Sequence, residues 1–296
     1  MALGILLAGC GSVASGSGSH PGMIAVVAAE NTYGNVAAQV GGRYVVITSV
    51  ESNPSTDPHT YEVSPSVAQA VSTANVVVQN GDGYDGFMNT IESSSPDASR
   101  HVVDVQHLLG LPDTTSNPHF WYSPTTMPQV AAALAGAFSE VMPAHAAYFV
   151  ANASRFDASL APWLRAIAQL KGIGAATPVA TTEPVADDLL AAIGATNLTP
   201  MSFQLDVMNG TDPSPQDVSF ESNLLTQHHV KVLVYNQQVT DTLTQSFVTA
   251  AQQARVPVVG VYETMPTPGY TYQTWMLAET KALQRAIQGH ASTAHL

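Results

Sequence analysis

"MIAVVAAENTYGNVAAQVGGRYVVITSV", residues 23–50, gives the clearest indication of the fold class. Residues 23–30 form a short apolar run rich in β-branched side chains, which predicts a buried strand. Residues 33–42 predict a short helix that ends in glycine, and residues 44–50 predict a second strand. A strand, a helix and a strand joined by short connections favour a parallel α/β sheet.

The same alternation extends along the rest of the chain. In the N-terminal half the pattern predicts helices over 64–74 and 84–94 and strands over 76–81 and 101–105. Nearer the C-terminus it predicts strands over 178–183, 230–236 and 256–263, and helices over 184–194, 214–229, 242–255 and 270–288. The alternation stops in the middle of the chain and then restarts, so we expect two α/β lobes, each with its own parallel sheet.

A long helical tract separates the two series. Residues 125–142 and 143–171 both have helical periodicity, and the second range carries one apolar stripe. The stripe consists of Phe149, Ala153, Phe156, Leu160, Trp163, Ile167 and Leu170. At about 1.5 Å per residue, the second range spans roughly 40 Å, which is enough to run along both lobes. Pro162 lies inside this range and is expected to kink or split the helix.

Composition limits the possible partners. The chain has 296 residues, 10% of them charged, and a formal net charge of −13 with only nine Lys and Arg. Binding to nucleic acid needs a basic patch, so nucleic acid is not an expected partner. An acidic surface suits solubility and also attracts cations. No apolar run in the sequence reaches the eighteen or so residues that span a membrane.

The single cysteine, Cys10, lies in "LLAGCGS", residues 6–12, so no intrachain disulfide can form. This segment resembles a bacterial lipobox, in which the cysteine is lipidated and becomes the mature N-terminus. The Gly/Ser-rich residues 11–22 then read as a flexible tether. The alternative is an idle or buried lone thiol. We favour the lipoprotein interpretation because the tether follows Cys10 directly.

These observations predict four segments. Residues 1–22 are a lipoprotein signal remnant and tether, 23–142 the N-terminal α/β lobe, 143–172 the linking helix and 173–296 the C-terminal α/β lobe. Ligands of open α/β sheets gather at the carboxyl ends of the strands. A metal or ligand site is therefore expected in the cleft between the lobes.

Two nearly identical turns follow strands of the N-terminal lobe. "DPHTYEVSP", residues 57–65, and "NPHFWYSP", residues 117–124, both read Asp or Asn, Pro, His, any residue, aromatic and finally Ser-Pro. Proline stiffens each turn, and Asp57 or Asn117 is expected to hydrogen-bond the local backbone. Tyr61 and Trp121 are expected to form the walls of the site.

Four strand ends carry side chains that bind metals, namely His59, His119, Glu183 and Glu263. Two imidazoles and two carboxylates suit a divalent first-row transition metal rather than the all-oxygen cage that calcium prefers. Each residue has a structural alternative: a histidine in a polar loop is often only solvated, and Glu183 also suits a helix N-terminus. The remaining histidines are read as solvated or as helix ends. They are His20, His101, His107, His145, His228, His229, His290 and His295.

From Cys10 onward the chain resembles the cluster A-I metal-binding lipoproteins, the solute receptors of bacterial zinc and manganese ABC importers. The two Pro-His turns carry this resemblance, together with "VATTEPVADDLLAAIG" (179–194) and "VYETMPTPG" (261–269). It implies that His59 and His119 bind one metal ion from the N-terminal lobe, and Glu183 and Glu263 from the C-terminal lobe. It also implies a monomeric receptor that is lipid-anchored on the outer face of the cytoplasmic membrane and delivers the ion to a permease, without catalysis.

Two alternatives remain open from sequence. A metal-dependent hydrolase keeps one metal position free for water, yet the sequence has neither a His-Glu-x-x-His motif nor an evident nucleophile turn. A surface adhesin is the other alternative. The identity of the metal also stays open between manganese and zinc, with iron possible. Zinc-specific members of the resembled family often carry a His-rich loop near the cleft and a third histidine ligand. This chain has no His-rich run and offers Glu183 at the third position, so the resemblance favours manganese.

Overall fold

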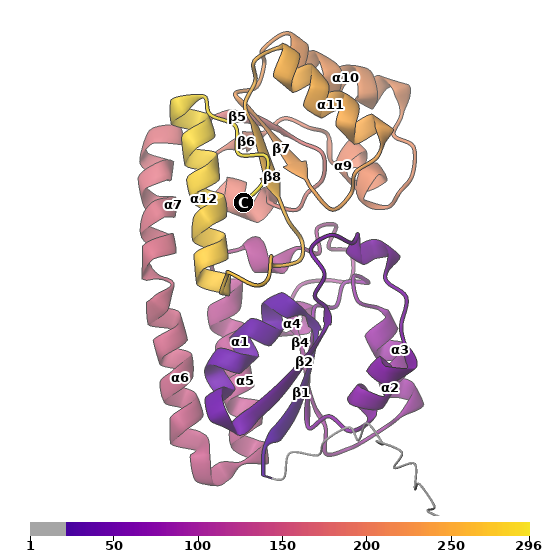
Figure 1. The fold of residues 1–296 in the computed structure, drawn as a ribbon, viewed down its shortest axis with the longest axis vertical. Helices are drawn as coiled ribbons and strands as arrows, with labels where there is room; N and C mark the ends of the chain where they lie inside the picture. The colour runs from indigo at the N-terminus through magenta and orange to yellow at the C-terminus, as the bar shows by residue number, and fades with distance from the viewer. Residues whose placement is uncertain (1–21) are drawn as a thin grey trace, which may run out of the picture.

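The computed structural model describes residues 22–296. The proposed lipidation site Cys10 and nearly all of the expected tether lie outside these residues. The described chain forms two α/β lobes that pack beside a long helical segment (Figure 1). The predicted fold class is confirmed: each lobe is built on one parallel four-stranded sheet.

The N-terminal sheet has the strand order β2-β1-β3-β4. Its strands are β1 (Ile24–Glu30), β2 (Val45–Glu51), β3 (Val76–Gln79) and β4 (His101–Asp104). The helices of this lobe are α1 (Asn31–Gly41), α2 (Pro65–Ser72), α3 (Phe87–Ser94), α4 (Val105–Leu108) and α5 (Thr126–Val141). Three short 3-10 turns complete it: η1 (Gly42–Tyr44), η2 (Pro58–Thr60) and η3 (Phe120–Tyr122).

The C-terminal sheet repeats this arrangement with the order β6-β5-β7-β8. Its strands are β5 (Pro178–Thr181), β6 (Thr196–Asn197), β7 (Val232–Asn236) and β8 (Val258–Val261). Its helices are α8 (Asp187–Ala192), α9 (Met201–Met208), α10 (Pro215–Thr226), α11 (Thr242–Gln253) and α12 (Tyr272–Gly289). The sequence pattern missed β6 and α9, and α8 begins at Asp187 rather than at the expected Pro184.

The central strands are buried because helices cover both faces of each sheet. All four residues of β3 and all five of β7 are buried, as expected for continuous apolar strands of a parallel sheet. Close packing at α1 requires Gly34, where an added Cβ would lie 2.2 Å from the Ser49 hydroxyl on β2. The lack of a side chain at Gly34 therefore allows α1 to pack directly against β2.

Two helices join the lobes. After the short 3-10 turn η4 (Pro143–His145), α6 (Ala146–Ser159) and α7 (Ala161–Gly174) stack end to end along one side of both lobes (Figure 1). The break falls at Leu160, two residues before Pro162, so the expected split is present. The predicted apolar stripe faces the core, and Trp163 donates a hydrogen bond of 2.9 Å to Thr280 on α12. The linker is therefore packed against the C-terminal lobe along its second half.

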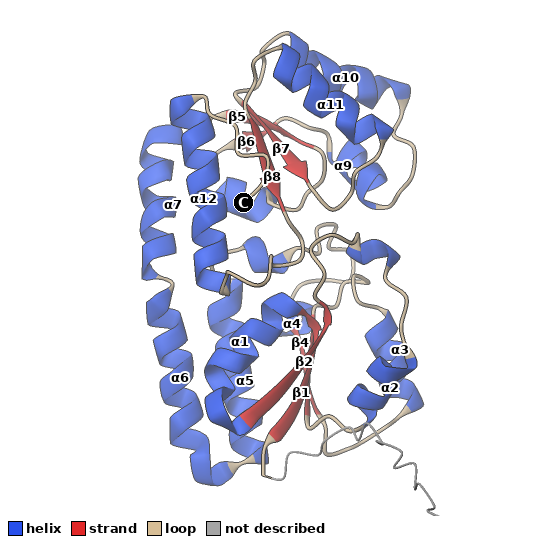
Figure 2. Cartoon of the chain, viewed as in Figure 1, coloured by secondary structure: helices blue, strands red, loops and turns tan. Residues whose placement is uncertain are grey.

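The strands of both sheets run toward the region between the lobes, as their arrowheads show (Figure 2). The carboxyl ends of eight parallel strands thus face one cleft, which is where open α/β sheets hold their ligands. Within residues 22–296 we find no helix with the length and apolar character needed to cross a membrane.

Candidate metal site

Each Pro-His turn is fixed by the residue that precedes its proline. The side chain of Asp57 accepts a hydrogen bond of 2.8 Å from the backbone N–H of His59. Asn117 does the same for the backbone N–H of His119, at 3.1 Å. The expectation that these two residues bond the local backbone is confirmed. Both turns are thus encoded by contacts between residues two positions apart.

Asn117 also sets the tautomer of His119. The Oδ1 of Asn117 lies 2.8 Å from Nδ1 of the His119 ring, while its Nδ2 donates to the carbonyl of Pro184 in the other lobe at 3.0 Å. Since Oδ1 can only accept, Nδ1 of His119 carries the proton and Nε2 is left to face the cleft. A hydrogen bond of this kind orients a metal-binding imidazole.

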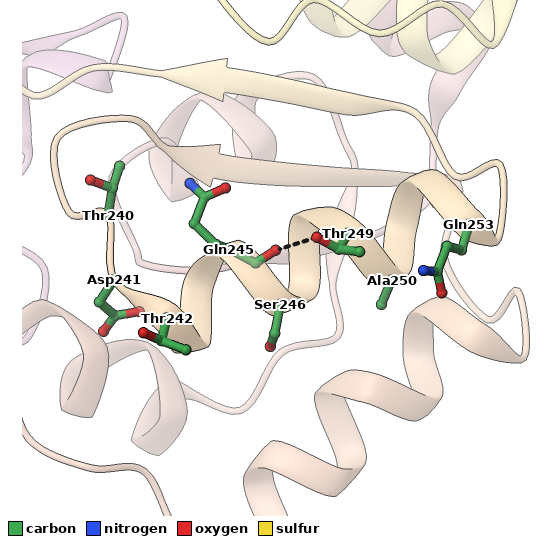
Figure 3. Close-up of a pocket in the computed structure, with 8 residues that line it drawn as sticks. All are labelled: Thr240, Asp241, Thr242, Gln245, Ser246, Thr249, Ala250 and Gln253. Carbon is green, nitrogen blue, oxygen red and sulfur yellow. Dashed lines mark hydrogen bonds between the residues drawn. The ribbon is translucent and has the colours of Figure 1, made fainter.

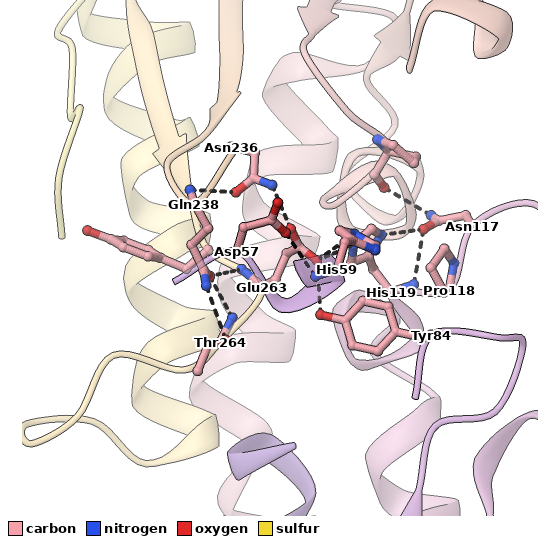
Figure 4. Close-up of polar contacts among 12 residues, drawn as sticks. Asp57, His59, Tyr84, Asn117, Pro118, His119, Asn236, Gln238, Glu263 and Thr264 are labelled. Carbon is pink, nitrogen blue, oxygen red and sulfur yellow. Dashed lines mark hydrogen bonds and ion pairs between the residues drawn. The ribbon is translucent and has the colours of Figure 1, made fainter. Parts of the chain in front are cut away.

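Glu263, two residues beyond β8, meets both histidines. Its Oε2 lies 3.0 Å from Nε2 of His119 and 3.2 Å from Nε2 of His59 (Figure 4). The Tyr84 hydroxyl donates to the same oxygen at 2.9 Å, and Nδ2 of Asn236 donates to Oε1 at 2.7 Å. One ligand atom from each of His59, His119 and Glu263 lies within 4.8 Å of the others.

The charges in this group are set by burial and by mutual contact. Burial lowers the pKa of His119 below its ordinary value. Burial acts in the same direction on His59, but the hydrogen bond and negative charge of Glu263 outweigh it, and the pKa of His59 is raised. Burial by itself would raise the pKa of Glu263, yet the two histidines hold it well below its usual range. Glu263 is therefore an anion at neutral pH.

Glu183, the fourth predicted ligand, lies in the same buried region but is not part of the compact group of three. It is 3% exposed, and neither carboxylate oxygen has a hydrogen-bond partner among the described residues. Burial, followed by the negative charge of Glu263, raises its pKa well above the usual value. A cation would relieve the cost of burying this carboxyl close to the negative charge of Glu263.

Further buried carboxyls stand at the strand ends of the N-terminal lobe. Glu30 and Glu51 are paired neighbours on β1 and β2, and Asp85 follows β3. Burial raises the pKa of Glu51 to about 9 and that of Asp85 to about 6. Glu51 is therefore mostly neutral near pH 7, whereas Asp85 is mostly ionised and accepts from the backbone N–H groups of Asn80 and Gly81. Glu263 is also ionised and contacts both histidines, so it is the anion best placed to meet a cation.

Aromatic rings enclose the two imidazoles. Trp121 packs edge-on against His119 with ring centroids 5.4 Å apart, as expected for a wall of the site. The Tyr84 ring packs edge-on against both histidine rings. Its centroid lies 5.2 Å from that of His59 and 5.8 Å from that of His119. Tyr61, the other expected wall, packs instead against Phe87. Sequence reasoning missed Tyr84; its signal was the glycine-rich segment "NGDGYDG", residues 80–86, directly after β3.

The group formed by the two histidine Nε2 atoms and Oε2 of Glu263 is stable only with a positive charge between these atoms. Nε2 of a neutral His119 points its lone pair at the Glu263 carboxylate only 3.0 Å away, which is unfavourable unless a proton or a metal ion lies between them. The His119 and Glu263 side chains are fully buried, whereas that of His59 is 19% exposed. The group is closed to solvent in this conformation, and His59 is its most accessible side chain.

A surface depression elsewhere lacks these features. A hollow of about 850 Å³ runs along α11 and is lined by threonine, serine and glutamine side chains (Figure 3). Its one titratable lining residue, Asp241, caps the helix by accepting from the backbone N–H of Thr244 at 2.7 Å. Asp241 therefore serves to stabilise the start of α11, and the residues that line this hollow include no second group able to bind a metal. The candidate site is the group formed by His59, His119 and Glu263.

Comparisons with known proteins identify the family of the chain. The profile of the family described as "Zinc-uptake complex component A periplasmic" matches residues 26–286. The manganese-binding lipoprotein MntA of Bacillus subtilis (strain 168) is 25% identical over 260 residues, which cover 83% of this chain and 81% of that protein.

Solved structures share the fold. The laminin-binding adhesin Lmb of Streptococcus agalactiae superposes with a TM-score of 0.74 at 15% identity, covering 90% of this chain and 100% of that one. The solute-binding protein FpvC of Pseudomonas aeruginosa, solved with Mn²⁺, gives a TM-score of 0.74 at 20% identity, with 90% of this chain and 99% of that one covered. At these identities the likeness concerns the fold alone.

Proposed function

The chain belongs to the zinc-uptake complex component A family, and from this premise we propose that it is an extracytoplasmic receptor that captures a divalent transition metal ion for an ABC importer. The metal ion is the cargo of the protein. His59, His119, Glu183 and Glu263 are the proposed ligands.

One observation carries this proposal: three ligand-type atoms from two lobes converge on one point. The N-terminal lobe supplies two imidazoles and the C-terminal lobe supplies a charged carboxylate, all within 4.8 Å. In the metal-free state this group needs a shared proton to offset its charge. A divalent cation would replace that proton and would hold the two lobes together.

Glu183 is proposed as the fourth ligand because its oxygens are buried and have no partner within the described chain. Imidazole ligands suit zinc and carboxylate ligands suit manganese, so a set of two imidazoles and two carboxylates is compatible with either ion. Manganese is the proposed cargo, since the relative in Bacillus subtilis is named a manganese-binding lipoprotein and carboxylates favour Mn²⁺. In a direct competition between Mn²⁺ and Zn²⁺, zinc is still expected to bind more tightly, because Mn²⁺ has the lowest affinity of the divalent first-row ions for a given N/O site.

The remaining parts of the proposal concern how the receptor works in the cell. We infer that the protein is monomeric, that it is anchored through a lipid on Cys10 at the outer face of the cytoplasmic membrane, and that it passes the ion to a membrane permease without catalysing a reaction. The lipoprotein relative supports the anchor. No contact among the described residues favours the hydrolase or the adhesin alternative.

Titration of metal-stripped protein tests this function. We expect one Mn²⁺ or Zn²⁺ per chain by calorimetry, and a higher melting temperature that a chelator reverses. A ligand at a hundredfold excess over its Kd contributes about 2.7 kcal/mol to the stability of the folded state. Mg²⁺ and Ca²⁺, which prefer oxygen ligands, serve as comparison ions.

Alanine variants provide the matched comparison. His119→Ala removes a proposed ligand, whereas His101→Ala removes a histidine that lies 3.5 Å from the exposed Glu140. The proposal requires a large loss of affinity for the first variant and none for the second. Equal losses, or no metal binding by the unaltered protein, would remove the basis for the proposed function.

A further inference from the structure

Gln238 contacts both lobes at once. It lies in the loop between β7 and α11 and is 7% exposed. Its Oε1 accepts hydrogen bonds from the backbone N–H groups of Glu263 and Thr264, both at 2.7 Å. Its Nε2 donates to the backbone carbonyl of Thr56 in the N-terminal lobe at 2.7 Å. It also donates to the Thr264 hydroxyl at 3.2 Å (Figure 4).

The orientation of this amide is determined by its partners. Two N–H donors face Oε1, and a carbonyl oxygen and a hydroxyl face Nε2. A flipped amide would place Nε2 against two donors and Oε1 against a carbonyl, which is unfavourable in a buried site. The backbone of Gln238 is also held, because its N–H donates to Oδ1 of Asn236 at 3.0 Å.

Each end of the amide leads to a proposed ligand. One end bonds the backbone of Glu263 itself. The other end bonds Thr56, three residues before His59, in a tight turn where Asn53 donates to the Thr56 hydroxyl at 2.7 Å. The next residue, Asp57, bonds the His59 backbone. A displacement of Thr56 is therefore transmitted to the histidine over a very short length of chain.

We propose that Gln238 is a positioning residue that couples Glu263 of one lobe to the His59 turn of the other and thereby sets how long a bound metal ion is retained. This inference rests on the proposed function. His59 is the one partly exposed member of the group of three, so an ion leaves most directly when the His59 turn moves away. That movement breaks the hydrogen bond from Gln238 to Thr56.

The inference predicts a kinetic effect. Loss of the bridge leaves the ligand side chains in place but lets the His59 turn open more often, so the dissociation rate rises and the association rate changes little. Groups that orient metal ligands typically contribute 10- to 100-fold to affinity. We therefore expect Gln238→Met to release Mn²⁺ or Zn²⁺ about 10- to 100-fold faster than the unaltered protein.

Release is measured by stopped-flow mixing of the metal-loaded protein with a fluorescent chelator. Asn31→Leu is the matched control. Asn31 is 6% exposed and also bonds across the cleft, to both backbone groups of Met265 at 2.8 and 3.1 Å, but it fixes no histidine turn. Thr264→Val removes the second partner of Nε2 and leaves the bridge to Thr56 intact.

The outcomes separate the two proposals. If the unaltered protein binds no metal, the proposed function fails. If it binds and Gln238→Met releases the ion at the unaltered rate, or no faster than Asn31→Leu, only the coupling role fails. Gln238→Asn, whose side chain is one carbon shorter and cannot span both sides, is the second variant should the methionine variant not fold. Faster release by Gln238→Asn, with a near-normal melting temperature of the metal-free protein, supports the coupling role.

Discussion

Replacing Glu263 by glutamine tests the electrostatic account of the site most directly. The substitution keeps the size and shape of the side chain but removes its charge. Glu263 is 1% exposed and contacts His59 at 3.2 Å, His119 at 3.0 Å, Tyr84 at 2.9 Å and Asn236 at 2.7 Å. It is the one member of the group of three that carries a negative charge, so its loss affects both the metal-free and the metal-bound protein.

The expected magnitude follows from these contacts. Removing one partner from a buried, hydrogen-bonded charge pair costs about 3–5 kcal/mol. Since about 1.4 kcal/mol corresponds to a tenfold change in Kd, Glu263→Gln is expected to weaken metal binding by roughly two to four orders of magnitude. The metal-free protein also loses stability. The pKa of Glu263 is lowered in the folded state, so its carboxylate stabilises the fold above the unfolded pKa, and this contribution is lost as pH falls through the folded pKa.

Glu279→Gln is the matched control. Glu279 is also fully buried, on α12, but it accepts from Trp275 at 3.0 Å and contacts no histidine. Burial raises its pKa to about 8, so it is mostly neutral at pH 7 and an amide replaces it at little cost.

Calorimetric titration at pH 7 and thermal unfolding without metal provide both readouts. We expect weak binding and a lower melting temperature for Glu263→Gln, and near-normal values for Glu279→Gln. Unchanged metal affinity in Glu263→Gln, or equal losses in both variants, would refute the reasoning that Glu263 supplies the charge of the site.

Further predictions concern pH, the Asn117 contact, the anchor and the linker. Metal affinity, followed by calorimetry from pH 8 to pH 5, should begin to fall above the ordinary histidine value of about 6.5, because Glu263 raises the pKa of His59 and the proton competes with the ion. A decline that begins only below pH 6 would contradict this. Asn117→Ala should lower affinity about 10- to 100-fold by freeing the His119 ring, while Asn117→Asp, which keeps an acceptor for Nδ1, should restore most of it. Cys10→Ala should release the protein from membranes or leave it unprocessed, and unchanged detergent-phase partitioning would count against the anchor. Scattering profiles with and without metal should differ only slightly, because α6 and α7 stack along both lobes; a large compaction would mean that the break at Leu160 is a free hinge.

The Pro-His turns could be read from sequence because they are local. Asp57 and Asn117 bond the backbone of histidines only two positions away, so no distant part of the chain is needed to form these turns. The break in the linker near Pro162 is local for the same reason, since proline removes one backbone donor and clashes with the preceding turn.

Weakly patterned elements were harder to predict. Strand β6 has only two residues, and α9 has little contrast between its faces, so neither produces a clear periodic signal. Helix α8 begins at Asp187 rather than at Pro184. The Pro184 carbonyl accepts from the backbone N–H of Asp187 at 3.1 Å in a turn before the helix, and also from Nδ2 of Asn117 of the other lobe at 3.0 Å. The second of these contacts comes from a residue that is remote in the chain, so no local pattern encodes it.

The pattern of residues alone predicts the two α/β lobes and the helical linker, because buried parallel strands and rigid turns are encoded in short stretches of chain. The same pattern indicates which residues are candidates for binding a metal ion. How these residues meet depends on the tertiary structure. Glu263 receives contacts from His119, Tyr84 and Asn236, and Gln238 joins its backbone to Thr56. These contacts depend on the path of the chain through α6 and α7 and on the exclusion of water from the cleft. Burial and proximity then set the charges, and no local pattern of residues encodes them.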